Sequence, residues 1–206
     1  MERTLLIYQT PSGKSPFSDW LSGMKDSKAR AVIRARLERI QLGNFGDCKS
    51  VGDGVSELRI PYGPGYRVYF GRQGETIVVL LCGGNKGTQQ KILIKPKYYG
   101  RSTKMPTKNY HNELIKQLKN PKEAAEYLNA CFEDSEEVFL AGLKNVVEAR
   151  GGVSAVARAT KLNRENLYRA LSKKGNPKLS SLSTILEALG IELQFAPAKK
   201  HHKQGA

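Results

Sequence analysis

Five side chains in the first half of the chain have the chemistry that RNA cleavage without a metal requires: Glu57, Arg59, Arg67, Tyr69 and Lys86. Residues 55–60 and 66–70 alternate in polarity as strands do, so each strand would carry two of these side chains on one face. Lys86 follows a third apolar run over residues 77–82. If the three strands pair, the five side chains gather on one surface of a sheet.

On such a surface, different residue types would have different roles in phosphodiester cleavage. Arginine and lysine hold the scissile phosphate and stabilise its extra negative charge, while Glu57 or Tyr69 would move protons. Residues 1–104 contain no histidine, and no acidic pair or histidine cluster suggests a metal, so neither a metal nor a cofactor is expected. The alternative is a basic sheet face that only binds RNA or the carboxylates of a partner.

A second group of side chains, near residues 153–172, suits DNA. Two short helices are predicted at 153–160 and 164–172, with Asn163 as the cap of the second, which is the anatomy of a helix-turn-helix. Its outward positions carry groups that reach base edges or phosphates. These are Arg164, Glu165, Tyr168, Arg169, Ser172, Lys173 and Lys174. The alternative is a helix pair that binds protein or is purely structural.

Such modules usually act as pairs, so a homodimer on operator DNA is expected. A helix over residues 180–189 and a predicted strand over 191–195 would provide an apolar dimer surface. The same apolar residues would equally close the core of the domain.

The elements of the first half predict an α+β domain over residues 1–100. A strand over residues 4–8 precedes a helix with Ser15 at its start and a second helix that Asp26 caps. Three strand patterns follow, which favours a small antiparallel sheet with two helices on one face. The apolar positions of the second helix face the core, and its basic residues are expected to point largely elsewhere.

The second half is predicted to be all-helical. A linker over residues 101–110 leads to a helical domain at 111–196, in which Pro121 and Ser135 mark helix starts. Residues 197–206 form a basic tail. No apolar run is long enough to cross a bilayer, and three widely spaced cysteines fit a reducing compartment, so a cytoplasmic protein without membrane contact is expected.

Charge is unevenly distributed along these 206 residues. Residues 1–104 carry 18 Lys and Arg against 8 Asp and Glu, a net charge of +10, whereas residues 111–150 carry 5 against 8, a net charge of −3. Residues 151–206 carry 10 against 3, a net charge of +7. A polyanion is the expected partner of both basic segments, and the acidic segment should be attracted to the first domain.

Sequence runs throughout residues 1–100 resemble HigB-like addiction-module killer proteins of the RelE/ParE toxin superfamily. They include GNFGD at 43–47, VGDGVSELR at 51–59, GPGYRVY at 63–69 and LCGGNKGTQ at 81–89. The resemblance implies an endoribonuclease that cleaves mRNA at the ribosome by activating a 2′-hydroxyl. It would use Arg59, Arg67 and Lys86 on the phosphate. ParE-like relatives act on gyrase instead.

Residues 110–196 resemble HigA-type antidotes of the same modules, through runs such as LNRENLYRALS at 162–172. The resemblance implies a type II toxin–antitoxin pair joined in one chain, in which the antidote blocks the toxin and represses its own operon. Residues 111–150 are the candidate neutralising surface, although these helices could equally be part of the antidote core. The competing hypothesis is an inert first half in a chain that acts only as a DNA-binding repressor.

Overall fold

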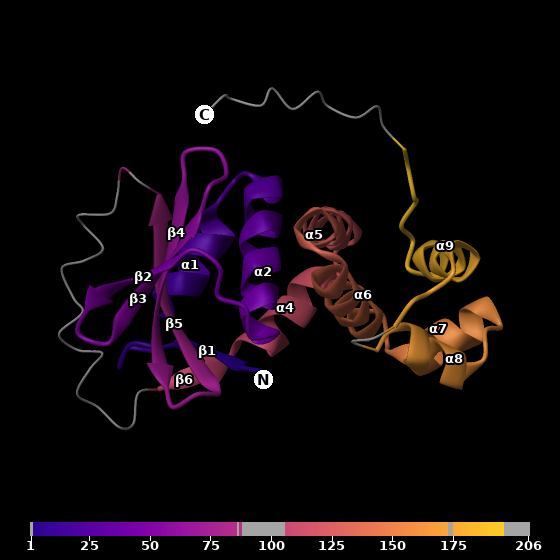
Figure 1. The fold of residues 1–206 in the computed structure, drawn as a ribbon, viewed down its shortest axis with the longest axis horizontal. Helices are drawn as coiled ribbons and strands as arrows, with labels where there is room; N and C mark the ends of the chain where they lie inside the picture. Colours follow the sequence, from indigo (N-terminus) through magenta and orange to yellow (C-terminus); the bar gives the residue numbers. More distant parts are fainter. Residues whose placement is uncertain (1, 86, 88–105, 173–174, 196–206) are drawn as a thin grey trace.

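The computed structural model of the protein describes residues 2–85, 87, 106–172 and 175–195 (Figure 1). These residues form a sheet at one end of the molecule and layers of helices that extend away from one face of it. A sheet region followed by an all-helical region agrees, at this coarse level, with the predicted α+β and helical parts.

The described strands form one six-stranded sheet in the order β2-β3-β4-β5-β1-β6. Their bounds are β1 Thr4–Tyr8, β2 Cys48–Gly52, β3 Val55–Ile60, β4 Tyr66–Gln73, β5 Ile77–Asn85 and β6 Thr107–Asn109. The prediction of an antiparallel sheet was wrong for one pair, because β1 runs parallel to β5. Parallel strands cannot be joined by a hairpin, and here two helices and three strands lie between them in the chain.

Two strands that the polarity pattern did not predict lie at the edges of the sheet. β2 is mostly exposed, so it lacks the apolar alternation that marks a half-buried strand. β6 falls inside the predicted linker and pairs antiparallel with β1. The Gln9 amide also donates to the Pro106 carbonyl at 2.8 Å. β6 is three polar residues long, and its sequence has no strand pattern. Backbone pairing with the edge of β1 therefore explains why β6 is extended.

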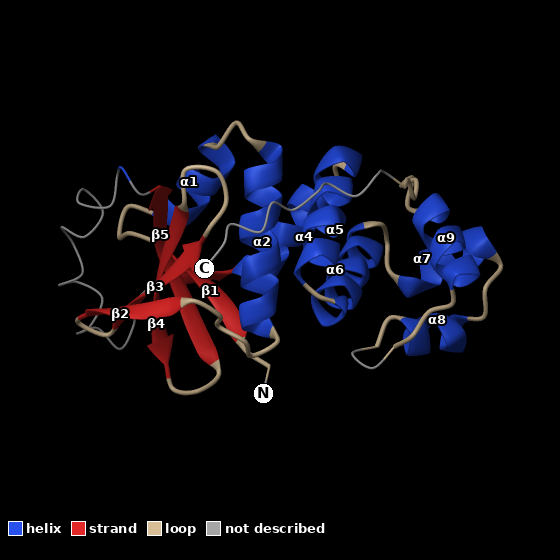
Figure 2. Cartoon of the chain, turned by 45° about the horizontal axis from the view of Figure 1, so that its top comes forward, coloured by secondary structure: helices blue, strands red, loops and turns tan. Residues whose placement is uncertain are grey.

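Helices α1 (Pro16–Gly23) and α2 (Ser27–Gln41) cover one face of this sheet (Figure 2). Asp26 caps α2 as predicted, by accepting from the Ala29 amide at 3.0 Å. The predicted apolar positions of α2 are all 0% exposed; they are Ala29, Ile33, Leu37 and Ile40. α1 lies so close to β5 that a Cβ on Gly83 would be 2.1 Å from the Trp20 ring, so only glycine fits there.

The remaining described helices follow in chain order. They are α4 (Tyr110–Leu118), α5 (Pro121–Asp134), α6 (Glu136–Ala149), α7 (Val153–Thr160), α8 (Arg164–Ala170) and α9 (Leu179–Ala188). Helices α4, α5 and α6 lie beside α2, and α7 to α9 lie farther from the sheet (Figure 1). The predicted strand over residues 191–195 does not form. No described strand lies beside it, and the Phe195 side chain is 90% exposed.

Buried apolar side chains form one continuous cluster that extends from the sheet to α9. It includes Ile33 of α2, Tyr127 of α5 and Ile185 of α9. A smaller cluster of Val55, Tyr69, Val79 and Leu81 marks the far face of the sheet, which is turned away from α1 and α2. Within the part of the chain that the structure describes, no helix is both long and apolar enough to cross a membrane.

Candidate functional site

Four of the five predicted RNA-site residues come together on the far face of the sheet. Arg59 Nε donates to Glu57 Oε1 at 2.9 Å, and Tyr69 Oη donates to Glu57 Oε2 at 2.9 Å. Arg67 donates to the same Oε1 atom as Arg59. Lys86 lies outside the described residues. Glu57, only 1% exposed, is therefore the centre of a charged group that we call the Glu57 cluster: Glu57, Arg59, Arg67 and Tyr69.

The strand register explains this geometry. Glu57 pairs across the strands with Tyr69, and Arg59 pairs with Arg67. Two arginines directly opposite each other repel, and the Glu57 carboxylate that both contact offsets this repulsion. The register on the other side of β3 places Lys49 of β2 opposite Glu57, which adds a cation that the sequence analysis missed. An unpredicted strand carries Lys49, so only the prediction of β2 would have found it.

Proton transfer is the weaker capacity of this cluster. Burial raises the pKa of the Glu57 carboxyl, but hydrogen bonds from Arg59 and Tyr69 and the charge of Arg67 outweigh burial, so the pKa lies below its usual range. Burial and the bond to Glu57 raise the pKa of the Tyr69 phenol well above its ordinary value. A carboxylate of low pKa is a weak base and a phenol of high pKa is a weak acid.

Anion binding is the stronger capacity. The Arg67 side chain, which donates to Glu57, is 17% exposed. The Arg59 side chain is 40% exposed, so part of its guanidinium faces solvent. Guanidinium groups bind phosphate oxygens through charge-assisted hydrogen bonds. The cluster can therefore hold a phosphodiester, with Glu57 fixing the orientation of its two arginines.

The predicted DNA-contacting residues of α8 are on its exposed side wherever the structure describes them. The exposed set is Arg164, Glu165, Tyr168, Arg169 and Ser172; Lys173 and Lys174 lie outside the described residues. Asn163 caps α8 as predicted, accepting from the Glu165 amide at 2.8 Å. The Arg164 guanidinium lies over the Tyr168 ring, 5.5 Å from its centroid, and donates to Tyr168 Oη at 3.2 Å. This contact holds Arg164 outward while buried Leu167 anchors the helix.

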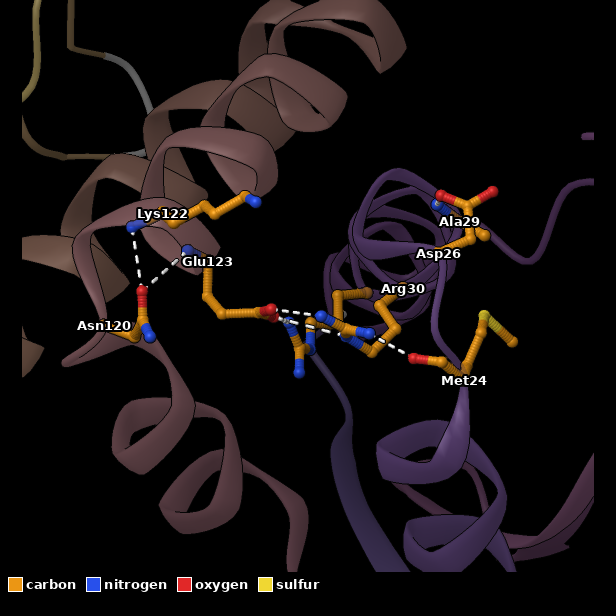
Figure 3. Close-up of polar contacts among 8 residues, drawn as sticks. Met24, Asp26, Ala29, Arg30, Asn120, Lys122 and Glu123 are labelled. Carbon is orange, nitrogen blue, oxygen red and sulfur yellow. Dashed lines mark hydrogen bonds and ion pairs between the residues drawn. The ribbon is translucent and has the colours of Figure 1, made fainter.

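The most extensive polar contact joins α2 to α5. Arg30 and Arg34 both bind the Glu123 carboxylate, and Arg30 also donates to the Met24 carbonyl (Figure 3). Farther along α2, Arg36 binds Asp134 at 2.9 Å and Arg39 lies 3.6 Å from it. We call these six residues the α2–α5 clamp: Arg30, Arg34, Arg36, Arg39, Glu123 and Asp134. The expectation that the basic residues of α2 point away from the core was wrong for Arg34, whose side chain is only 4% exposed.

Behind the clamp, a buried carboxylate links α2 to two helices. Glu38 Oε2 accepts from Tyr127 Oη at 3.0 Å and from Asn145 Nδ2 at 2.8 Å. Burial raises the pKa of Glu38, and the two hydrogen bonds lower it only in part. A buried carboxylate is costly unless it is hydrogen-bonded. Tyr127 of α5 and Asn145 of α6 therefore supply the hydrogen-bond donors that the Glu38 carboxylate of α2 requires.

Comparison with known proteins identifies the family to which the helical half of the chain is similar. Residues 108–197 match the family model described as "Probable addiction module antidote protein". An uncharacterized protein of Haemophilus influenzae is 54% identical over 81 residues, which are 39% of this chain and 82% of that protein. The chain belongs to the addiction module antidote family. A second uncharacterized protein of the same organism is 34% identical over 88 residues, which are 42% of this chain and 90% of that protein. No solved structure matches the chain.

The antidote match covers the helical half of the chain. Residues 108–197, which we call the antidote part, begin within β6 and include every helix from α4 to α9. Glu123, Asp134, Tyr127 and Asn145 all belong to it, so the clamp and the Glu38 contacts join the antidote part to the preceding sheet region. An antidote implies a toxin as its partner.

The sequence analysis expected residues 111–150 to contact the basic first half but did not identify the contact residues. The pairs are 89 to 107 positions apart in the chain, and no local pattern signals them. The available signal was compositional: α5 carries four carboxylates, and the helix that it packs against carries four arginines.

Proposed function

We propose that the chain is an addiction module in one polypeptide, in which the antidote part restrains a ribonuclease formed by residues 1–100. The observation that carries this proposal is the α2–α5 clamp. It shows an antidote-family helix lying against a basic helix of the preceding region through ion pairs. An antidote would act on a tethered toxin in this way, since tethering keeps the effective concentration at about millimolar.

In the proposed reaction, a 2′-hydroxyl of mRNA gives up its proton to solvent water and attacks the adjacent phosphorus to form a 2′,3′-cyclic phosphate, while the bond to the 5′-oxygen breaks and that oxygen takes a proton from water. Arg59 and Arg67 would bind the phosphate, and Lys86 would do the same from its place after β5. Glu57 would orient the two arginines, because its low pKa suits an anion that stays ionised. Tyr69 would position Glu57 rather than transfer the proton, and no metal or cofactor enters this scheme. The ribosome would present the mRNA.

The second activity in the proposal is repression of the operon. The exposed side of α8, with Arg164, Tyr168 and Arg169, would enter the major groove of operator DNA. Two copies of the chain would bind two half-sites as a homodimer. Support comes from the outward set of α8 side chains and from the stacking of Arg164 on Tyr168, which reduces the freedom that a base-reading arginine would lose on binding.

The proposal is tested by opening the clamp in the full-length chain. Glu123→Lys with Asp134→Lys would place cations against the α2 arginines, and cells that express this variant should stop growing and accumulate cleaved mRNA. Adding Arg67→Ala should restore growth. The control is Glu133→Lys with Glu137→Lys, which changes the same charge at exposed positions of α5 and α6. These cells should grow like those with the parent chain.

Continued growth of cells with a folded Glu123→Lys, Asp134→Lys chain, the open-clamp variant, would overturn the ribonuclease proposal. The chain would then be a DNA-binding repressor with an inert first half. Operator binding by the open-clamp variant would test that remaining activity. Arrest with intact mRNA and inhibited gyrase would instead assign the first half to the ParE-like activity.

A further inference from the structure

Three cations of the far face lie on three neighbouring strands. Arg67 is on β4, Arg59 on β3 and Lys49 on β2, and the pairing register places all three side chains on the same face of the sheet. Arg59 is directly opposite Arg67. Lys49 is opposite Glu57 and therefore diagonal to Arg59, at a separation of about 7–8 Å. Because β2 is an edge strand, these cations lead from the interior of the sheet to its edge.

The Glu57 carboxylate does not neutralise Lys49. Its Oε1 atom accepts from Arg59 and Arg67, and its Oε2 atom accepts from Tyr69. Among the described residues, the Lys49 ammonium forms no ion pair, and its side chain is exposed on the edge strand. The ammonium is therefore available to an anion that extends from β3 toward β2.

The surroundings of Lys49 limit the directions that a polyanion could take from Arg59. Toward one end of the strands the far face becomes apolar, at Val51 of β2 and Val55 of β3. Toward the other end lies exposed Asp47, whose carbonyl accepts from the Arg59 amide at 2.9 Å. A phosphate backbone gains nothing from the apolar side chains and is repelled by Asp47. Lys49 is therefore the favourable next contact after Arg59.

This face of the sheet is turned away from the antidote part. α2 covers the other face, and α5 packs against α2 (Figure 1). Among the described residues of the antidote part, none forms a hydrogen bond or ion pair with Glu57, Arg59 or Arg67. Restraint through the clamp therefore acts at another surface, and the far face can be probed in the full-length chain.

We propose that Lys49 forms a second phosphate subsite, which binds the RNA phosphate next to the one that Arg59 and Arg67 hold. Single-stranded RNA then crosses the strands from β4 to the β2 edge instead of following one strand. Positively charged surfaces that follow the backbone are a general way to bind single strands. This inference rests on the proposed function, because it takes the Glu57 cluster as the site of the scissile phosphate. Lys49 contacts no reacting atom and determines the path of the RNA.

The test measures RNA binding by the full-length chain without requiring cleavage. The probe is a fluorescein-labelled single-stranded 2′-O-methyl RNA, which lacks the nucleophilic hydroxyl, and the measurement is fluorescence anisotropy over a range of salt concentrations. The reference chain carries Arg164→Gln and Arg169→Gln, so that α8 contributes little to binding. Adding Lys49→Gln should reduce the slope of log affinity against log salt by about 0.7, the value for one phosphate contact on a single strand. Relative to about 1 M salt, this is a roughly fivefold loss of affinity at about 0.1 M.

The matched control is Lys25→Gln, which makes the same change in net charge at an exposed position between α1 and α2, the helices on the other face. Its salt slope should equal that of the reference chain, and its affinity should stay within about 1.5-fold. Lys49→Arg keeps a cation at the subsite and should keep both values. Equal losses in Lys25→Gln and Lys49→Gln would overturn the inference, because net charge alone would explain binding.

Arg59→Gln distinguishes failure of this inference from failure of the proposed function. If Arg59→Gln weakens binding and Lys49→Gln does not, RNA reaches the Glu57 cluster by another path and only the inference is overturned. If neither variant weakens binding, RNA does not bind this face and the ribonuclease proposal fails as well. Weaker binding by Lys49→Gln with an unchanged salt slope would also overturn the inference, because Lys49 would then act through the fold and not on a phosphate.

Discussion

The Glu57 cluster and the α2–α5 clamp use the same chemical unit in two different places. In each, a glutamate accepts from two arginines. Burial raises the pKa of that carboxyl, but the hydrogen bonds that it accepts and the charges of its arginines outweigh burial and hold the pKa below its usual range. The partners of Glu57 are 2 to 12 positions from it in the chain, and one arginine is 40% exposed. The partners of Glu123 are 89 and 93 positions from it, and Arg34 is 4% exposed.

The difference shows how burial decides the use of an ion pair. The exposed edge of the Glu57 cluster leaves guanidinium donors for a ligand, so its carboxylate serves mainly to orient them. The clamp directs its donors at another part of the same chain, and at its Glu123 end the arginines are only 16% and 4% exposed. Desolvated charges are expensive unless paired, so loss of Arg34, which is 4% exposed, should be costly, whereas loss of Arg59, which is 40% exposed, should be much less so.

The largest expected effect is therefore on stability at the clamp. Arg34→Ala should cost about 3 kcal/mol, because it removes the more buried arginine of the pair that binds Glu123, a carboxylate that is only 14% exposed. Arg59→Ala should leave the unfolding midpoint nearly unchanged, because Glu57 keeps Arg67 and Tyr69 as donors. Urea denaturation of the two variants measures both values, and equal losses would show that the two regions do not differ in the way proposed.

The next effect is on catalysis at the cluster. In the open-clamp variant, Arg67→Ala should lower the rate of RNA cleavage about 100-fold, or about 2.7 kcal/mol in the barrier, because it removes a phosphate donor. Tyr69→Phe should lower the rate only a few-fold, because a phenol with a raised pKa transfers protons poorly. Initial rates on an RNA oligonucleotide give the ratio. A larger loss in Tyr69→Phe would reverse the assigned roles.

A smaller effect is expected where α5 begins. Asn120 accepts from the Lys122 amide at 2.9 Å and from the Glu123 amide at 3.4 Å, so it fixes the turn that carries Glu123 (Figure 3). Asn120→Ala should cost about 1 kcal/mol, and Asn120→Asp, which keeps the cap, should cost little. Thermal unfolding measures the difference, and equal losses in both variants would exclude capping as the cause.

The smallest expected effect is a change in pH dependence at Glu38. Burial raises its pKa in the folded chain, so the parent chain should lose stability as pH rises from the ordinary carboxyl range through this higher value. Glu38→Gln keeps an acceptor for Tyr127 and cannot ionise. Its stability relative to the parent chain should therefore increase as pH rises from the ordinary carboxyl range through the raised pKa of Glu38. Contributions of Glu57 and Glu123, which are lost as pH falls, cancel in this comparison.

Sequence reasoning identified the elements whose patterns are local. The cap at Asp26 and the buried positions of α2 follow from helical spacing, and the sides of β3 and β4 follow from strand alternation. The Glu57 cluster was predictable for the same reason, since its members lie on two neighbouring strands with a short turn between them. Lys86, Lys173 and Lys174 stay predictions, because they lie outside the described residues.

Features that depend on distant parts of the chain were not predictable. The parallel pairing of β1 with β5, the strand β6 and the burial of Arg34 all require contacts with segments far away in sequence. The predicted strand over residues 191–195 failed in the opposite way, because it has the right alternation but no partner strand in the described residues. Polarity patterns define which side of an element is apolar but do not define what covers it.

The pairing of β6 with β1 determines which backbone groups would become exposed if the antidote part were removed from the first half. β6 closes the outer side of β1, where Leu6, Ile7 and Tyr8 would otherwise present unpaired backbone amides and carbonyls beside apolar side chains. An uncovered strand of this kind is a template for pairing with other chains. Proteolytic loss of the antidote part would therefore leave the first half with an unpaired edge strand. Degradation of the antidote part would then favour self-association of the first half and would also uncover α2.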